Sequence, residues 1–200
     1  MLKPKLVLFD IGGVLIDYTA WFQTASRDLD IPIDLIKESF KKYKREITIC
    51  DITPQQMFAN CIADNNLAVD DQYDFTKSWV RDYKKIQSSY ELFINLSKTY
   101  QVGFLSNIYK GLVPMMLNER LLPNVPNSIN FHSCDIGLKK PEIEMYEYVQ
   151  DKTGYSKNEI FFIDDQKQNL APVQSLCWQM YNFEFEKVAE NVYDLTRRLL

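Results

Sequence analysis

Hydrophobic and polar positions follow different spacings in three parts of the chain. An apolar run over residues 5–10 predicts a buried first strand. From Tyr18 to about Gln87 the apolar positions lie three and four residues apart, which predicts helices without convincing strands. After Ser88, short apolar runs alternate with helical patterns. Alternation of this kind is typical of a parallel sheet with helices on both faces.

Four helices are expected between residues 18 and 87. The apolar face of the first helix carries Trp21, Phe22, Ala25 and Leu29, and that of the second carries Leu35, Ile36, Phe40 and Tyr43. The third helix begins after Thr53, and the apolar face of the fourth carries Phe75, Trp79 and Tyr83. Thr53 before Pro54 is typical of a helix N-cap, and the fourth helix is expected over Asp70–Tyr83. We expect the aromatic side chains of this block to form its core rather than to contact a substrate: Trp21, Phe22, Phe40, Phe58, Phe75 and Trp79.

The remaining elements complete an α/β domain. Helices are expected over 89–99, 109–119, 141–151, 168–176 and 187–198, and strands over 102–105, 129–131, 159–163 and 178–182. The sequence therefore predicts a core domain of residues 1–17 and 88–200. Residues 18–87 are predicted to be a small helical cap above the carboxyl edge of the sheet.

Composition and charge exclude several classes of protein. Hydrophobic residues make up 46% of the 200 residues, enough for a sizeable core, and no stretch approaches the roughly 20 apolar residues of a membrane span. The net charge of −4 leaves no basic footprint for nucleic acid. The single histidine, His132, argues against a histidine zinc site or a Ser-His-Asp triad, and we expect it to be structural.

The cysteines and the first residues bear on location. Cys50, Cys61, Cys134 and Cys177 lie far apart and form no CxxC pair, so we expect reduced thiols in a cytoplasmic protein. The basic residues 1–5 run straight into a strand without a small-residue cleavage site, so no secretory signal is expected.

Polar residues that can carry chemistry follow four predicted strands or turns. These are Asp10 with Gly12 and Gly13, Ser106 with Asn107, Lys140 before Pro141, and Asp164 with Asp165. The carboxyl ends of parallel strands share one edge of a sheet, so an acid, a hydroxyl, an ammonium and an acid pair converge there. Each segment alone is as well explained by a helix cap or a solvated loop. Their common order after buried strands is what favours a functional site.

This set resembles the four motifs of the haloacid dehalogenase-like (HAD) phosphohydrolases, in order and roughly in spacing, over residues 5–182. It is most similar to sugar-phosphate phosphatases with a small helical cap and to the amino-terminal phosphatase domain of soluble epoxide hydrolases. Both share the FxDD…N segment, here residues 162–169. The resemblance implies a Rossmann-like fold, a small phosphorylated metabolite as substrate and Mg²⁺ as cofactor. Oligomeric state is left open.

The resemblance also implies residue roles. Asp10 would be the nucleophile that forms an aspartyl-phosphate, which divides one hard step into two. Asp10, Asp165, the backbone carbonyl of Gly12 and the nearby Asp164 would hold Mg²⁺, which prefers oxygen ligands. Lys140 would neutralise the nucleophile and the phosphoryl group. Ser106, Asn107 and main-chain N–H groups, with Gly13 among the phosphate-binding residues, would hold the phosphoryl oxygens.

Position 12 departs from the family pattern. Most HAD phosphatases carry there an aspartate that protonates the leaving group, and general acid–base catalysis contributes about 10²–10⁴-fold. Three readings stay open: a phosphatase that uses another proton source, a haloacid dehalogenase, and a binding or regulatory protein. The acid pair favours the phosphatase, and Asp17 is a weak candidate for the missing acid. Without that acid, substrates with good leaving groups should be favoured.

The cap predicts a closed site for a small substrate. A lid of this kind excludes water during phosphoryl transfer and fits a sugar phosphate better than a phosphoprotein. The first cap helix and a loop near Lys44, Arg45 and Glu46 are expected to face the site. Either cation is a candidate to bind a distal acidic or hydroxyl group.

Overall fold

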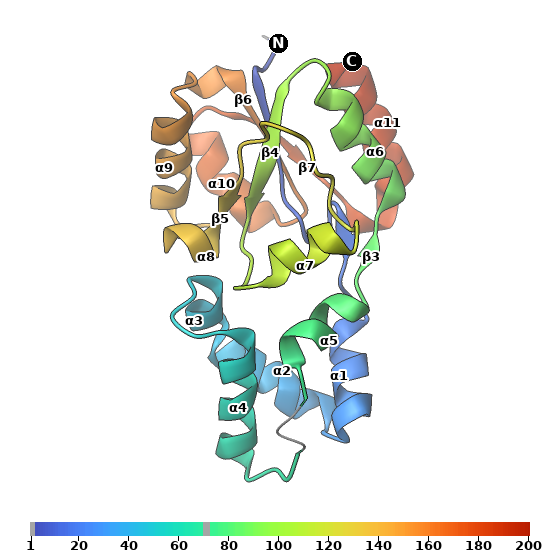
Figure 1. Ribbon diagram of the computed structural model, residues 1–200. Coiled ribbons are helices and arrows are strands. Elements are labelled where there is room, and N and C mark those ends of the chain that lie inside the picture. Colours follow the sequence, from blue (N-terminus) through green and yellow to red (C-terminus); the bar gives the residue numbers. More distant parts are fainter. Residues whose placement is uncertain (1–2, 70–72) are drawn as a thin grey trace.

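A parallel sheet forms the centre of the molecule. The computed structural model describes residues 3–69 and 73–200. Five parallel strands lie in the order β5-β4-β1-β6-β7 (Figure 1). They are β1 (Leu6–Phe9), β4 (Gln101–Ser106), β5 (Phe131–His132), β6 (Ile160–Asp164) and β7 (Gln179–Asn182). The α/β class predicted from the alternating pattern is confirmed.

Helices cover both faces of this sheet, because alternate side chains of β1 are apolar on both sides. Val7 and Phe9 pack with α6 (Gln87–Leu96) and α11 (Val188–Leu199). Leu6 and Leu8 pack with α9 (Ile143–Thr153) and α10 (Lys167–Ser175) on the opposite face (Figure 1). The chain passes from β1 to β4 on one side and later to β6 on the other. The carboxyl end of β1 is therefore a topological switch point, where open sheets bind ligands.

The helical segment, described over residues 18–69 and 73–87, lies beyond the carboxyl ends of the strands (Figure 1). Its helices are α1 (Trp21–Leu29), α2 (Ile33–Lys42), α3 (Lys44–Thr48), α4 (Pro54–Asn65) and α5 (Phe75–Arg81). The predicted cap at Thr53 is confirmed, because its hydroxyl accepts the N–H of Gln56 while the Gln56 side chain accepts the N–H of Thr53. The division into core and cap domains remains a prediction.

Aromatic packing holds the helical segment together. The rings of Trp21 and Trp79 stack with centroids 4.1 Å apart, and those of Phe58 and Phe75 stack at 4.5 Å. Trp21, Trp79, Phe22 and Phe40 also line the cavity described below. The expectation that these aromatics serve only as core was therefore incomplete.

Two expectations for the helical segment were wrong. Lys84–Lys85 forms a short strand, β3, that pairs antiparallel with β2 (Ile16–Asp17). Strands of two residues carry no periodic signal. Lys44 and Arg45 belong to the short helix α3 rather than to a loop, because the buried Ile47 and Thr48 anchor this turn.

Several element boundaries also differ from those expected. Asn130 accepts the N–H of Phe104 through its side chain rather than its main chain, so β5 is confined to Phe131–His132. Gly111 has a left-handed backbone (φ 86°), and α7 (Leu112–Asn118) begins only after it. The side chain of Asp74 caps α5, while the expected start at Asp70 lies outside the described residues.

The remaining elements are short. They are α8 (Ser133–Ile136) and the 3₁₀ helices η1 (Lys157–Glu159) and η2 (Phe185–Lys187). No helix among the described residues combines the length and apolar content that a membrane crossing requires.

Candidate active site

The structure brings the residues of the four predicted segments together at the carboxyl end of β1. Asp10 follows β1, Ser106 ends β4 and Asp164 ends β6, and all three are buried. Lys140 comes from the turn before α9, and its Nζ lies 3.0 Å from Asp10 Oδ1 and 2.6 Å from Asp164 Oδ2. Lys140 is itself buried, so its charge is balanced by these two carboxylates rather than by water.

Burial dominates the electrostatics of this cluster. It raises the pKa of Asp10 to about 6, although Lys140 and the Ser106 hydroxyl act in the opposite direction. Burial, together with the charges of Asp10 and Asp164, raises the pKa of Asp165 to about 7. Burial works against the ammonium of Lys140, but Asp10 and Asp164 outweigh it and leave the pKa of Lys140 above its usual value. The cluster therefore holds more negative charge than one lysine neutralises.

The acidic residues fit a divalent cation. Asp10, Asp164 and Asp165 each offer one oxygen, and these oxygens all lie within 4.8 Å of one another. Asp164 already accepts bonds from Lys140, from the Asn169 amide and from the N–H of Gln166. By contrast, Oδ1 of Asp165 is buried without a hydrogen-bond partner among the described residues. A hard cation binds oxygen ligands, so it would give a partner to a carboxylate oxygen that makes no hydrogen bond and lies beside two further acids.

Asn107 positions Lys140. Its Oδ1 accepts the N–H of Lys140 and its Nδ2 donates to the carbonyl of Lys140, both at 2.8 Å. We expected Asn107 to bind phosphate, and this stays a prediction. In the structure its side-chain amide fixes the main chain that carries the lysine.

Two geometric features require glycine at position 13. Its φ of 74° is left-handed, and a Cβ there would lie 2.5 Å from Asp165 Oδ2. Its N–H donates to the carbonyl of Ile16 at 2.9 Å. The Gly13 N–H is thus used within the turn, and the expectation that Gly13 binds phosphate stays a prediction.

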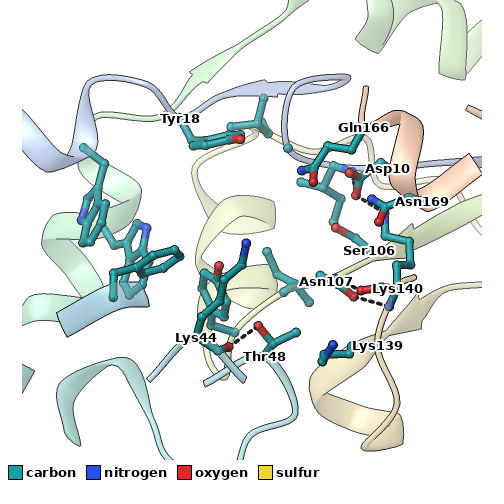
Figure 2. A pocket seen from close by; sticks show the side chains of 18 of the residues that line it. Asp10, Tyr18, Lys44, Thr48, Ser106, Asn107, Lys139, Lys140, Gln166 and Asn169 are labelled. Carbon is teal, nitrogen blue, oxygen red and sulfur yellow. Dashed lines mark hydrogen bonds and ion pairs between the residues drawn. The ribbon is translucent and has the colours of Figure 1, made fainter. Parts of the chain in front are cut away.

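Tyr18 occupies the space beside Gly12. A Cβ on Gly12 would lie 3.0 Å from a ring carbon of Tyr18. Tyr18 lines the cavity, and its hydroxyl end points to the side where Asp10 lies (Figure 2). Asp17, the weak candidate for the missing acid, accepts the N–H and hydroxyl of Thr19 and is absent from the cavity wall among the described residues. The sequence carried no signal for Tyr18, because the contact depends on the turn between β1 and β2.

A cavity of about 490 Å³ lies between the sheet edge and the helical segment. The core contributes Asp10, Ser106, Asn107, Lys140, Gln166 and Asn169, and the helical segment contributes its aromatic rings with Lys41, Lys44, Arg45 and Thr48 (Figure 2). Ser133 of α8 donates to the carbonyl of Thr48 at 2.6 Å and so joins α3 to the core. His132 pairs with Asp135 at 3.0 Å and is not among the described residues that line the cavity.

Comparisons with known proteins agree with this arrangement. No protein-family model matches the chain. The solved structures that are similar in fold include two enzymes with bound ligands. One is the HAD family enzyme BT-2542 from Bacteroides thetaiotaomicron, in complex with magnesium and inorganic phosphate (22% identity, TM-score 0.73, covering 90% of this chain and 94% of that chain). The other is L-2-haloacid dehalogenase from Xanthobacter autotrophicus with chloropropionic acid covalently bound (15%, TM-score 0.67, covering 90% and 77%). The chain therefore has the haloacid dehalogenase-like fold, as its four segments predicted.

One curated protein is also similar in sequence. Bifunctional epoxide hydrolase 2 of Sus scrofa is 24% identical over an alignment of 199 residues, which covers 86% of this chain and 35% of that protein. The chain thus spans about a third of the length of this relative.

Proposed function

We propose that this protein is a Mg²⁺-dependent phosphatase that hydrolyses a small phosphate monoester, such as a sugar phosphate, through an aspartyl-phosphate on Asp10. The observation that carries the proposal is the buried carboxylate cluster, in which Asp165 Oδ1 lacks a partner among the described residues. The magnesium and phosphate bound by the similar enzyme BT-2542 support it.

The chain's own residues supply most of the chemistry. Asp10 is directed at the cavity with Lys140 at 3.0 Å, so its carboxylate is held in place for attack on phosphorus. Lys140 balances the charge of the nucleophile and of the transferring phosphoryl group, and Ser106 offers a hydroxyl to its oxygens. Asn107 keeps Lys140 in position through the main chain. A cation held by Asp10, Asp165 and the Gly12 carbonyl would offset repulsion between the nucleophile and a dianionic ester.

A haloacid dehalogenase is the second candidate, because Gly12 lacks the usual acid and a dehalogenase shares the fold. Displacement of halide from carbon uses one carboxylate as the nucleophile. A metal-free enzyme has less use for two further acids, the buried Asp164 and the half-buried Asp165, that repel the first. The charge balance of this cluster therefore favours the metal-dependent phosphatase.

The test is phosphate release from p-nitrophenyl phosphate and from a sugar-phosphate panel, with Mg²⁺ and with EDTA. We expect Mg²⁺-dependent release by the native protein, loss of release in Asp10→Asn, and retention in Asp17→Asn, whose carboxylate only caps Thr19. Halide release from 2-haloacids without metal would instead establish the dehalogenase. Binding of Mg²⁺ and phosphate with no turnover of any compound would establish a binding protein.

A further inference from the structure

The cavity wall is cationic in a chain whose net charge is −4. Among the described residues that line it there is one carboxylate, Asp10, beside five cationic side chains: Lys41, Lys44, Arg45, Lys139 and Lys140. In the proposed mechanism, Lys140 and Mg²⁺ together offset the charges of the reacting phosphate and of its nucleophile. The other cations need a separate explanation.

Two of the five are already paired. Lys140 contacts Asp10 and Asp164, and Lys139 lies 3.0 Å from Glu142. The remaining three, Lys41, Lys44 and Arg45, form no ion pair within the described part of the chain.

The neighbouring Lys42 provides an internal comparison. It does not line the cavity, and its Nζ lies 2.7 Å from Asp64. Where α2 faces α4, the fold thus supplies an acid for a lysine of this helix. The cations that face the cavity lack such a partner, so their charge is available to a ligand.

The three cations lie across the cavity from the nucleophile. They come from the end of α2 and the start of α3, whereas Asp10 lies at the end of β1. Figure 2 shows the Lys44 side chain extending into the cavity from the wall opposite Asp10. Trp21, Phe22 and Trp79 line the same side and offer apolar surface to a carbon skeleton.

We propose that the substrate carries a second anionic group, a phosphate or a carboxylate, and that Lys41, Lys44 and Arg45 bind it. This inference rests on the proposed function, since it names the class of ester: a bisphosphate or a phosphorylated carboxylic acid. Lysine and arginine form charge-assisted hydrogen bonds with both groups. A cavity of about 490 Å³ is large enough for a metabolite with an anion at each end.

The experiment compares three substrates with the same number of carbons: fructose 6-phosphate, fructose 1,6-bisphosphate and 6-phosphogluconate. The second and third separate phosphate from carboxylate as the distal group. We expect the native protein to prefer one of these two over fructose 6-phosphate by about tenfold or more in kcat/KM, mainly through KM. Lys44→Ala with Arg45→Ala should abolish this preference. Lys42→Ala, a cation outside the cavity, should retain it.

Two outcomes overturn the inference while leaving the phosphatase intact. One is Asp10-dependent phosphate release without preference for either substrate that carries a second anionic group. The other is a preference that survives in the Lys44→Ala, Arg45→Ala protein. A binding measurement covers the case of no turnover: calorimetry of Asp10→Asn with fructose 6-phosphate, fructose 1,6-bisphosphate and 6-phosphogluconate. Equal affinity for all three ligands would also overturn the inference, whereas a preference removed by the double substitution would support it.

Discussion

Replacing Asp165 with asparagine removes a charge that the metal-free fold accommodates poorly. The side chain lies beside Asp10 and Asp164 and has a buried oxygen without a partner among the described residues. Asparagine has nearly the same shape but no ionisable group. We therefore expect Asp165→Asn to stabilise the protein when Mg²⁺ is absent.

The size of the gain follows from the pKa of Asp165, which is raised from 3.8 to about 7. Each pH unit between these values corresponds to about 1.4 kcal/mol, so ionisation costs the folded state up to about 4 kcal/mol. Solvent at the open side of the half-buried carboxylate offsets part of this cost. We expect a gain of about 2 to 4 kcal/mol at about pH 8.

The sign of the pH dependence follows from the raised pKa. Below about pH 4 the carboxyl is protonated in both states and the substitution changes little. As pH rises towards 7, the unfolded chain releases its proton first, and the native metal-free protein loses stability relative to the variant. The gain from Asp165→Asn should therefore grow between about pH 4 and pH 7 and then level off.

Denaturant unfolding followed by tryptophan fluorescence measures this effect in EDTA and in Mg²⁺. Mg²⁺ should stabilise the native protein at about pH 8 and have little effect on the variant, because the cation binds the folded state. Asp151→Asn, at an exposed position on α9, is the matched control and should change neither result. A variant that is less stable than the native protein in EDTA at this pH would refute the reasoning.

Three further predictions test other parts of the site. Lys140→Met leaves Asp10 and its neighbouring acid buried without a cation and should cost about 3–5 kcal/mol in denaturant unfolding at neutral pH; a loss below about 1 kcal/mol would contradict the pairing. Gly13→Ala forces a Cβ to within 2.5 Å of Asp165 Oδ2 and should weaken Mg²⁺ binding in calorimetry, so unchanged affinity would show that the loop adapts. Gly12→Asp alone should gain little turnover of alkyl phosphates, because the Tyr18 ring lies 3.0 Å from the new Cβ. Adding Tyr18→Ala should raise kcat for alkyl phosphates about tenfold or more, and an equal gain from the single substitution in steady-state kinetics would contradict the steric argument.

The sequence predicted those parts of the site that depend on strand ends. Asp10, Ser106 and Asp164 each follow a run of apolar residues. The carboxyl ends of parallel strands lie at the same edge of a sheet, so these residues come together there. Lys140 was placed correctly for a related reason, since it lies in the turn that precedes a helix on the same edge. Continuous apolar runs are a reliable guide for β1, β4 and β6 because these strands are buried on both faces.

What the sequence did not predict depends on contacts between distant or very short segments. The pairing of Ile16–Asp17 with Lys84–Lys85 joins two strands of two residues that are far apart in the chain. The contact of Tyr18 with Gly12 follows from that turn rather than from any local pattern. The hydrogen bonds from the Asn107 side chain to the main chain of Lys140 were also missed, because nothing in the sequence shows that these two segments lie within reach of each other.

The ribbon of β2 and β3 sets how the cavity can open. The chain enters the helical segment through one of these strands and leaves through the other, and because the strands are paired, the two crossings form a single pivot. On the far side, Ser133 donates a hydrogen bond to Thr48, and Tyr109 of the core contacts the rings of Phe40 and Trp79. Rotation about the pivot would break these contacts and move Lys44 and Arg45 away from Asp10, whereas Tyr18, next to the pivot, would move least. The two ends of the binding site would thus meet only when the cavity closes, and a ligand that spans both would hold it shut.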